Sequence, residues 1–180
     1  MGDISRNFSY SEFKISASYP KVVAAIQLSK LDNYKFFWMT HLFLQPSRDI
    51  TEKKIVVTSG IRRGELNGLV GGVRNSDHCY NRFSAAVDFR VMGKTKTDIL
   101  TRQYLDVIYR VCRRRREYVK QFIYYYPDWR DGRERGDFIH IALRDKTTRI
   151  WEVMYCVARE GRTYFNSRQE AEEHWRGLNT

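Results

Sequence analysis

The sequence predicts an α+β fold in a single domain of residues 1–180, with a central, mostly antiparallel sheet flanked by helices. Its 180 residues, 42% of them hydrophobic and 29% charged, suit one globule that buries its own core. Strand-like runs are grouped instead of alternating strictly with helix-like runs, which favours antiparallel pairing. No internal repeat, low-complexity tract or linker divides the chain, so one domain is expected.

In the N-terminal half, local patterns mark where helices start and stop. Ser9 followed by Glu12 has the spacing of a capping box, and Pro46 is expected to end the helical stretch before it. Gly60 and Gly71 mark predicted turns. The elements expected here are a short helix at 9–14, one or two buried helices at 21–44, a buried strand at 54–58 and a short helix at 65–70.

In the C-terminal half, Thr97 is expected to cap a long amphipathic helix, and Ser167 with Glu170 predicts the start of the last helix. The pair Glu160–Gly161 predicts the turn of a hairpin over 153–165. The elements expected here are a strand at 85–91, a helix at 97–120, a strand at 121–126, a charged loop at 128–136, strands at 138–143 and 150–157, and a helix at 167–176.

The net charge of +11 predicts a polyanionic neighbour, whether nucleic acid, an anionic membrane or an acidic cell wall. Four consecutive arginines, Arg113–Arg116, lie near the predicted end of the long helix. We interpret them as a solvated helix end, which the helix dipole favours, with a docking patch for an anionic surface as the alternative.

The three cysteines, Cys79, Cys112 and Cys156, have neither disulfide-framework nor metal-knot spacing and are expected to be free thiols. No export segment and no membrane span is predicted, so we expect synthesis and folding in the cytoplasm. A role outside that compartment would require release by another agent.

Candidate metal ligands come from three separate places in the chain: His78, Asp88 and His140. Strand alternation predicts that Asp88 and His140 each face opposite to their apolar neighbours in sequence. Two imidazoles and one carboxylate form a three-ligand zinc set that leaves a fourth position for water, which is typical of a catalytic site. His41 lies in an apolar stretch and is interpreted as a packed or surface histidine instead. Because such residues occur in most chains of this size, the spacing alone is weak evidence.

Two further residues are candidates for the chemistry beside such a zinc ion. Zinc lowers the pKa of its bound water to about 7 and polarises a carbonyl. Asp137 is the candidate for the base that takes the proton, although it lies three residues before His140 and has the opposite strand parity. Arg62 is the candidate for stabilising the oxyanion.

A basic nucleic-acid-binding protein, or a metal nuclease using the same histidines, is the alternative from another functional class. The run Arg113–Arg116 and an aromatic content of 14% support it. No recognised nucleic-acid motif is present, which makes nucleic acid the less favoured partner.

The central segment also carries more specific phrases. They read TSGIRRGELNGLVGG, then NSDH, then AAVDF, and are preceded by NFSYSEF and FLQPSRDI. With them, the sequence resembles the zinc D-alanyl-D-alanine carboxypeptidase and L-alanyl-D-glutamate endopeptidase family, which includes VanX- and VanY-like enzymes and phage endolysins. The resemblance spans about 8–143 and leaves 144–180 as a C-terminal extension, expected to pack on the same domain.

The resemblance implies a hedgehog/DD-peptidase-like fold and one zinc ion. Ser76 matches the first position of the family's SxH motif and would contact the substrate, and Arg62 would bind the substrate carbonyl and its oxyanion. Asp137 stands where the family commonly has a glutamate base. The implied zinc ligands are His78, Asp88 and His140.

The sequence also departs from the family pattern. His78 and Asp88 are ten positions apart where the family has seven, so the turn between them is expected to bulge. Ile61 replaces the usual tyrosine, and aspartate at position 137 shortens the base by one methylene. A family member that keeps the metal but has lost catalysis is therefore a second alternative.

The implied function is hydrolysis of a peptide bond in peptidoglycan stem peptides, of the D,D-carboxypeptidase or L-Ala-D-Glu endopeptidase type, by a phage lysis or entry enzyme. The expected partners are the stem peptide as substrate and anionic cell-wall polymers. In the extension, four aromatic residues are expected to complete the core, with a binding surface as the alternative: Tyr155, Tyr164, Phe165 and Trp175.

Overall fold

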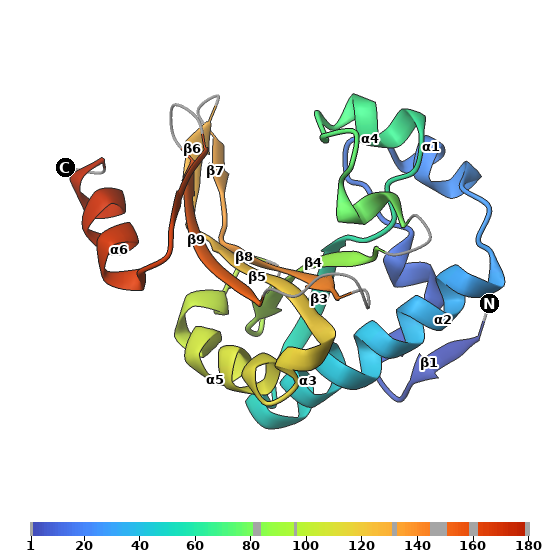
Figure 1. Ribbon diagram of the computed structural model, residues 1–180, viewed down its shortest axis with the longest axis horizontal. Helices are drawn as coiled ribbons and strands as arrows, with labels where there is room; N and C mark the ends of the chain where they lie inside the picture. The colour runs from blue at the N-terminus through green and yellow to red at the C-terminus, as the bar shows by residue number, and fades with distance from the viewer. Residues whose placement is uncertain are drawn as a thin grey trace.

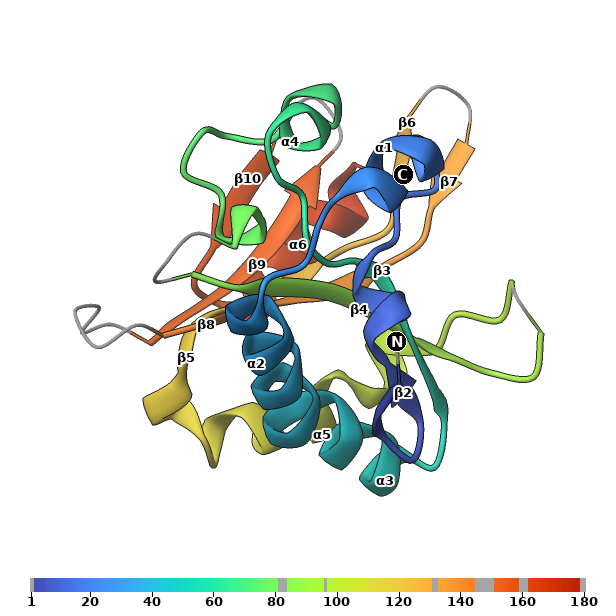
Figure 2. The same cartoon turned by 90° about the vertical axis from the view of Figure 1, so that its right-hand side faces the viewer.

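A computed structural model shows a mixed six-stranded sheet with long helices packed against one of its faces (Figures 1 and 2). This architecture confirms the predicted α+β class. The structure describes residues 2–80, 84–95, 97–130, 133–144, 151–158 and 162–178.

The sheet has the strand order β10-β9-β5-β8-β4-β3. All neighbouring strands are antiparallel except β5 and β9, which run parallel. The predicted hairpin is therefore formed by β9 and β10, and its predicted turn at Glu160–Gly161 lies outside the described residues. The strands are β3 (Lys54–Ser59), β4 (Ala86–Met92), β5 (Val119–Tyr125), β8 (Phe138–Leu143), β9 (Glu152–Ala158) and β10 (Arg162–Phe165).

Helices occur between these strands in the sequence, and several of them cover one face of the sheet, which we call its helical side. They are α1 (Pro20–Ala25), α2 (Lys30–Met39), α3 (Gln45–Thr51), α4 (Glu65–Leu69), α5 (Thr101–Arg113) and α6 (Arg168–Gly177), with a π turn η2 (Thr40–Leu44) and 3-10 turns η1 (Tyr10–Phe13), η3 (Asp77–Cys79) and η4 (Arg116–Tyr118). Two small ribbons, β1 (Asp3–Ser5) with β2 (Phe8–Ser9) and β6 (Asp128–Arg130) with β7 (Arg133–Arg135), lie outside the large sheet.

The two faces of the sheet have different environments because successive strand residues point to opposite sides. On β8, Ile139 and Ile141 pack into the main core with Phe122 and Tyr124 of β5. His140 lies between the two isoleucines and faces the other side, as predicted. On that second face, the loop after α4 and the β9–β10 hairpin line a cleft. Figure 1 shows α4 and β9 on opposite sides of the molecule.

The short capping patterns are confirmed. Ser9 and Glu12 form a reciprocal capping box at η1, and the Ser167 hydroxyl accepts a hydrogen bond from the Glu170 N–H at the start of α6. Both patterns act within four residues, so no tertiary contact is needed to fix them.

The long helix predicted at 97–120 is wrong at both ends. The chain before α5 instead pairs with β4, since Ile99 bridges Met92 and the Leu100 N–H donates to Val91 O at 2.8 Å. The helix ends at Arg113, because Val119 already pairs with β8. Arg113 itself is exposed at the helix end, as expected for a solvated cation.

Two other expectations in the chain are corrected. Pro46 does not end the preceding helical stretch, because the widened turn η2 places it in the first turn of α3, where a missing N–H is tolerated. The charged segment 128–136 is not only a loop, since its backbone forms the antiparallel ribbon β6–β7.

Candidate metal centre

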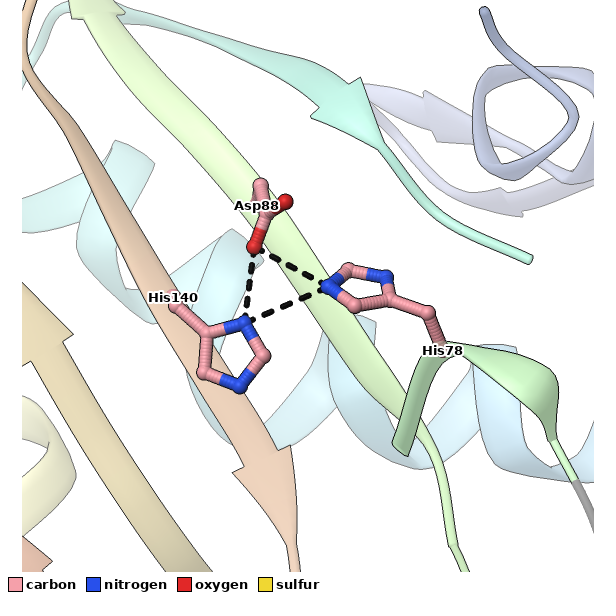
Figure 3. A group of neighbouring side chains, drawn as sticks. All are labelled: His78, Asp88 and His140. Carbon is pink, nitrogen blue, oxygen red and sulfur yellow. Dashed lines mark hydrogen bonds and ion pairs between the residues drawn. The ribbon is translucent and has the colours of Figure 1, made fainter. Parts of the chain in front are cut away.

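Three side chains from separate elements meet on the cleft face of the sheet (Figure 3). Asp88 lies on β4, His140 on β8 and His78 on η3. Asp88 Oδ1 lies 2.8 Å from His140 Nδ1 and 3.1 Å from His78 Nε2, and the two ring nitrogens are 3.3 Å apart. All three residues are buried, with exposed fractions of 1–9%.

Strand register brings Asp88 and His140 together. The two residues are directly paired across the antiparallel strands β4 and β8, so their side chains leave the sheet side by side on the same face. This pairing connects residues that are 52 positions apart in the sequence.

His78 is held from the opposite side by the turn after β3. Its Nδ1 lies 2.7 Å from Gly60 O, and its backbone carbonyl accepts a hydrogen bond from the Arg62 N–H at 2.7 Å. A Cβ atom at Gly60 would collide with the backbone of Phe13, so only glycine allows this close approach. The Ser76 hydroxyl accepts a hydrogen bond from the His78 N–H and caps η3.

The ten-residue spacing between His78 and Asp88 is accommodated by folding Tyr80 into the core. Tyr80 adopts a left-handed backbone conformation with φ 51°, and its hydroxyl donates to Ala86 O at 2.8 Å. Its carbonyl oxygen accepts a hydrogen bond from Arg63 at 3.2 Å. Tyr80 therefore turns inward, and both candidate ligands lie on the same face; the predicted bulge includes residues 81–83, which lie outside the described part of the chain.

When His78 is neutral, the lone pair of its Nε2 points at the ionised carboxylate of Asp88. Because Gly60 O only accepts hydrogen bonds, Nδ1 of neutral His78 carries the proton and Nε2 presents a lone pair to the Asp88 carboxylate. Burial lowers the pKa of His78 despite the opposing charge of Asp88. Burial raises the pKa of Asp88, but the neighbouring His78 and His140 outweigh it and hold this pKa well below its usual value.

A zinc ion fits this donor set. Zinc–ligand bonds of roughly 2.0–2.2 Å in a tetrahedron place neighbouring ligand atoms about 3.3–3.6 Å apart. The three separations of 2.8, 3.1 and 3.3 Å need only a small outward movement to reach that geometry. A cation would also remove the repulsion between the Nε2 lone pair and the ionised carboxylate.

The group opens into a cleft of about 550 Å³ that Arg62 also lines. Arg62 Nε is buried and has no hydrogen-bond partner among the residues that the structure describes. An unsatisfied guanidinium N–H beside the candidate ligands is suited to bind an anionic or carbonyl oxygen. Ser76 lines the same cleft.

A comparison with protein families matches residues 7–113 to the family described as Peptidase M15. The chain belongs to the Peptidase M15 family. Members of this family are zinc peptidases, which agrees with the donor set of His78, Asp88 and His140 and implies a peptide substrate. Neither the search of curated proteins nor that of solved structures gives a match.

The structure does not bring Asp137, the expected base, together with the candidate ligands of this M15 site. Asp137 lies on the helical side of the sheet, where its Oδ2 accepts a hydrogen bond from the Tyr124 hydroxyl at 2.7 Å. Its carboxylate also accepts the Arg102 N–H in the first turn of α5, and its backbone carbonyl accepts from Arg90 Nε at 3.0 Å. Asp137 thus caps α5, whose N-cap residue Leu100 provides no side-chain acceptor.

Sequence reasoning missed the contribution of the C-terminal extension to this cleft. Met154, Arg162 and Tyr164 line it, although they lie beyond the matched residues 7–113. Tyr164 is therefore a cleft residue, whereas Tyr155, Phe165 and Trp175 pack against the main core. Strand alternation could have separated Tyr164 from Phe165, but nothing local indicated which face of the sheet carried the site.

The remaining expectations concern single side chains and the membrane. His41 is exposed and its Nε2 lies 3.1 Å from Ile4 O, away from the M15 site. None of the three cysteines forms a disulfide with another described residue. None of the helices formed by the described residues has the length and apolar character needed to span a lipid bilayer.

Proposed function

We propose that this M15 protein is a zinc metallopeptidase that hydrolyses a peptide bond in bacterial peptidoglycan stem peptides, of the D,D-carboxypeptidase or L-Ala-D-Glu endopeptidase type. The observation that carries the proposal is the convergence of His78, Asp88 and His140 in a cleft that is also lined by Arg62, whose Nε has no hydrogen-bond partner among the described residues. The phrases TSGIRRG, NSDH and AAVDF support the stem-peptide substrate through their resemblance to enzymes of that specificity. A role in phage lysis or entry is part of the same proposal.

His78, Asp88 and His140 would hold the zinc ion. Zinc supplies Lewis acidity, which polarises a carbonyl and makes water more acidic. Gly60 O keeps the His78 proton on Nδ1, so that Nε2 stays available as a ligand. The buried Arg62 Nε–H is placed to donate to the substrate carbonyl oxygen as negative charge develops on it.

Among the described residues, no carboxylate other than Asp88 forms a hydrogen bond or ion pair with His78 or His140 and could take the place of Asp137 as proton acceptor. Besides Asp88, the carboxylates that line the cleft are Asp77, which pairs with Lys120 at 2.9 Å, and Glu152, which accepts from Gln121 at 2.7 Å. The position of Asp137 on the other face of the sheet therefore favours one second candidate function: a zinc-binding M15 protein that binds stem peptides without turning them over.

The net charge of +11 supports anionic cell-wall polymers as a further proposed partner. The exposed Arg114 and Arg116, just beyond the end of α5, contribute to this charge. Attraction of this kind is screened by salt, so binding to purified wall polymer should weaken steeply as ionic strength rises.

Metal analysis of the purified protein, combined with mass spectrometry of digested peptidoglycan, tests cofactor and bond together. We expect one zinc per chain and defined stem-peptide fragments. His140→Ala should lose both, whereas His41→Ala, at an exposed histidine away from the site, should keep both. Cleavage that persists in His140→Ala would reject the site, and a zinc-loaded protein that binds but cuts no stem peptide would select the second candidate.

A further inference from the structure

The outer part of the cleft is built by the β9–β10 hairpin, which lies beyond the residues matched to the M15 family. Register places this hairpin beside the candidate ligands. Tyr125 of β5 pairs with Phe138 on β8, two residues before His140, and with Cys156 on β9. Cys156 in turn pairs with Tyr164 on β10, so one row of residues crosses the sheet from β8 to β10.

Arg162 lies on β10 two residues before Tyr164, pairs with Ala158 of β9, and lines the cleft next to this row. Its guanidinium lies 5.8 Å from the centroid of the Tyr125 ring, and Tyr125 Oη lies 3.5 Å from Tyr164 Oη. Burial alone would lower the pKa of Arg162, but the adjacent Tyr125 and Tyr164 raise it overall. The two tyrosines thus position the cation without neutralising it.

No carboxylate in the described part of the chain lies within ion-pair distance of Arg162. This distinguishes it from Lys120 in the same cleft, which pairs with Asp77. Among the residues that the structure describes, Arg162 and Arg62 are therefore two cations of the cleft without an acidic partner, one on each side of it. A substrate that bears a carboxylate would supply the missing charge.

Between Arg162 and the candidate ligands, the floor of the cleft is apolar. Ile123 and Met154 belong to a small hydrophobic cluster on this face, and Phe138 stacks on Tyr125 with centroids 4.3 Å apart and planes at 8°. This floor offers surface for the aliphatic part of a peptide, and it leaves the cation at the far end as the polar anchor.

The distance between the candidate ligands and Arg162 fits a peptide that is cut at the ligands and anchored at Arg162. Tyr125 is one strand across and two residues along from His140, which by standard sheet spacings is roughly 8 Å between Cα atoms. With Arg162 beyond the Tyr125 ring, its guanidinium lies on the order of 10 Å from the ligands, which is about three residues of extended chain.

We propose that Arg162, positioned by Tyr125 and Tyr164, is a specificity-determining residue that binds a free carboxylate on the peptide substrate two to three residues from the bond that is cut. This inference rests on the proposed function and adds the substrate class: stem peptides with a free carboxylate at that position, in preference to the same peptides carrying a carboxamide. The hairpin lies outside the matched segment 7–113, so the family match itself does not assign this role to Arg162.

The test uses pairs of synthetic stem peptides that differ at one position, where a free carboxylate is replaced by a carboxamide. Arg162→Met removes the charge and keeps much of the side-chain length, Arg162→Lys keeps the charge, and Arg113→Met removes an exposed arginine at the end of α5 as the matched control. For each zinc-loaded variant, kcat and KM are measured, and binding of both peptides is measured by calorimetry.

We expect Arg162→Met to lower kcat/KM for the carboxylate peptide by about ten- to hundredfold, mainly through KM, and to leave the carboxamide peptide unchanged. Arg162→Lys should recover part of the preference, and Arg113→Met should match the wild type. Equal losses on both peptides, or no loss on either, would overturn the role of Arg162. Absence of cleavage by the wild type would instead reject the proposed function, and a carboxylate preference in binding that Arg162→Met abolishes would still support this subsite.

Discussion

The position of Asp137 gives a prediction that separates a helix-capping role from a catalytic one. Asp137 is only 5% exposed, and its carboxylate accepts the Tyr124 hydroxyl and the Arg102 N–H. Asp137→Ala leaves both donors without an acceptor. At about 1–3 kcal/mol for each unsatisfied buried donor, the free energy of unfolding should fall by roughly 2–6 kcal/mol.

A cavity beside Asp137 reduces the loss of unfolding free energy that we expect. A hollow of about 680 Å³ lined by Asp137, Arg90 and Arg102 lets water reach the orphaned Arg102 N–H. We therefore expect the lower part of the range, about 2–4 kcal/mol, which corresponds to a fall in Tm of roughly 4–16 °C for a chain of this size. Asp137→Asn keeps one acceptor oxygen and should cost about half as much.

The assay is thermal unfolding of both variants together with zinc content and peptide cleavage. If Asp137 is a cap, the folded Asp137→Ala protein keeps its zinc, and its activity below the transition follows the folded fraction. An unchanged Tm combined with loss of cleavage would refute this reasoning and indicate a catalytic role for Asp137.

Three further predictions follow from the site. Removing zinc with a chelator should lower Tm, since a ligand at a hundred times its Kd stabilises the fold by about 2.7 kcal/mol, and scanning calorimetry with and without chelator measures the difference. Gly60→Ala should lower both stability and zinc affinity, because its Cβ collides with Phe13 while Gly60 O holds His78. The control is Gly68→Ala, where the added Cβ meets no atom within 4 Å. Equal stability and zinc affinity in the two variants would argue against this account. Arg62→Met should lower kcat by roughly 10²–10³-fold with zinc content unchanged, as for loss of one oxyanion donor, and a change in KM alone would assign Arg62 to substrate binding only.

The elements that sequence reasoning predicted are those fixed by neighbours in the chain. The capping box at Ser9 and the strands β4 and β8 depend on patterns within a few residues. The start of α5 does not, because Ile99 is held by β4 and the cap comes from Asp137, 37 positions after Leu100. Parallel pairing of β9 with β5 is likewise a tertiary choice that neither strand's alternation specifies.

In the candidate site too, local patterns predicted some residues, whereas tertiary contacts decided the position of others. Alternation correctly placed Asp88 and His140 on the faces opposite their apolar neighbours, and register then made the two residues direct partners. The same rule gives Asp137 the opposite parity from His140, and the chain does not bend it back, because Tyr124 and the first turn of α5 already provide its hydrogen-bond donors on the helical side. A carboxylate at that position turns to the face of the sheet that provides its hydrogen-bond donors. In this chain the helix does so, and the polar wall of the cleft is left to residues of the hairpin such as Arg162, which no local pattern assigns to the site.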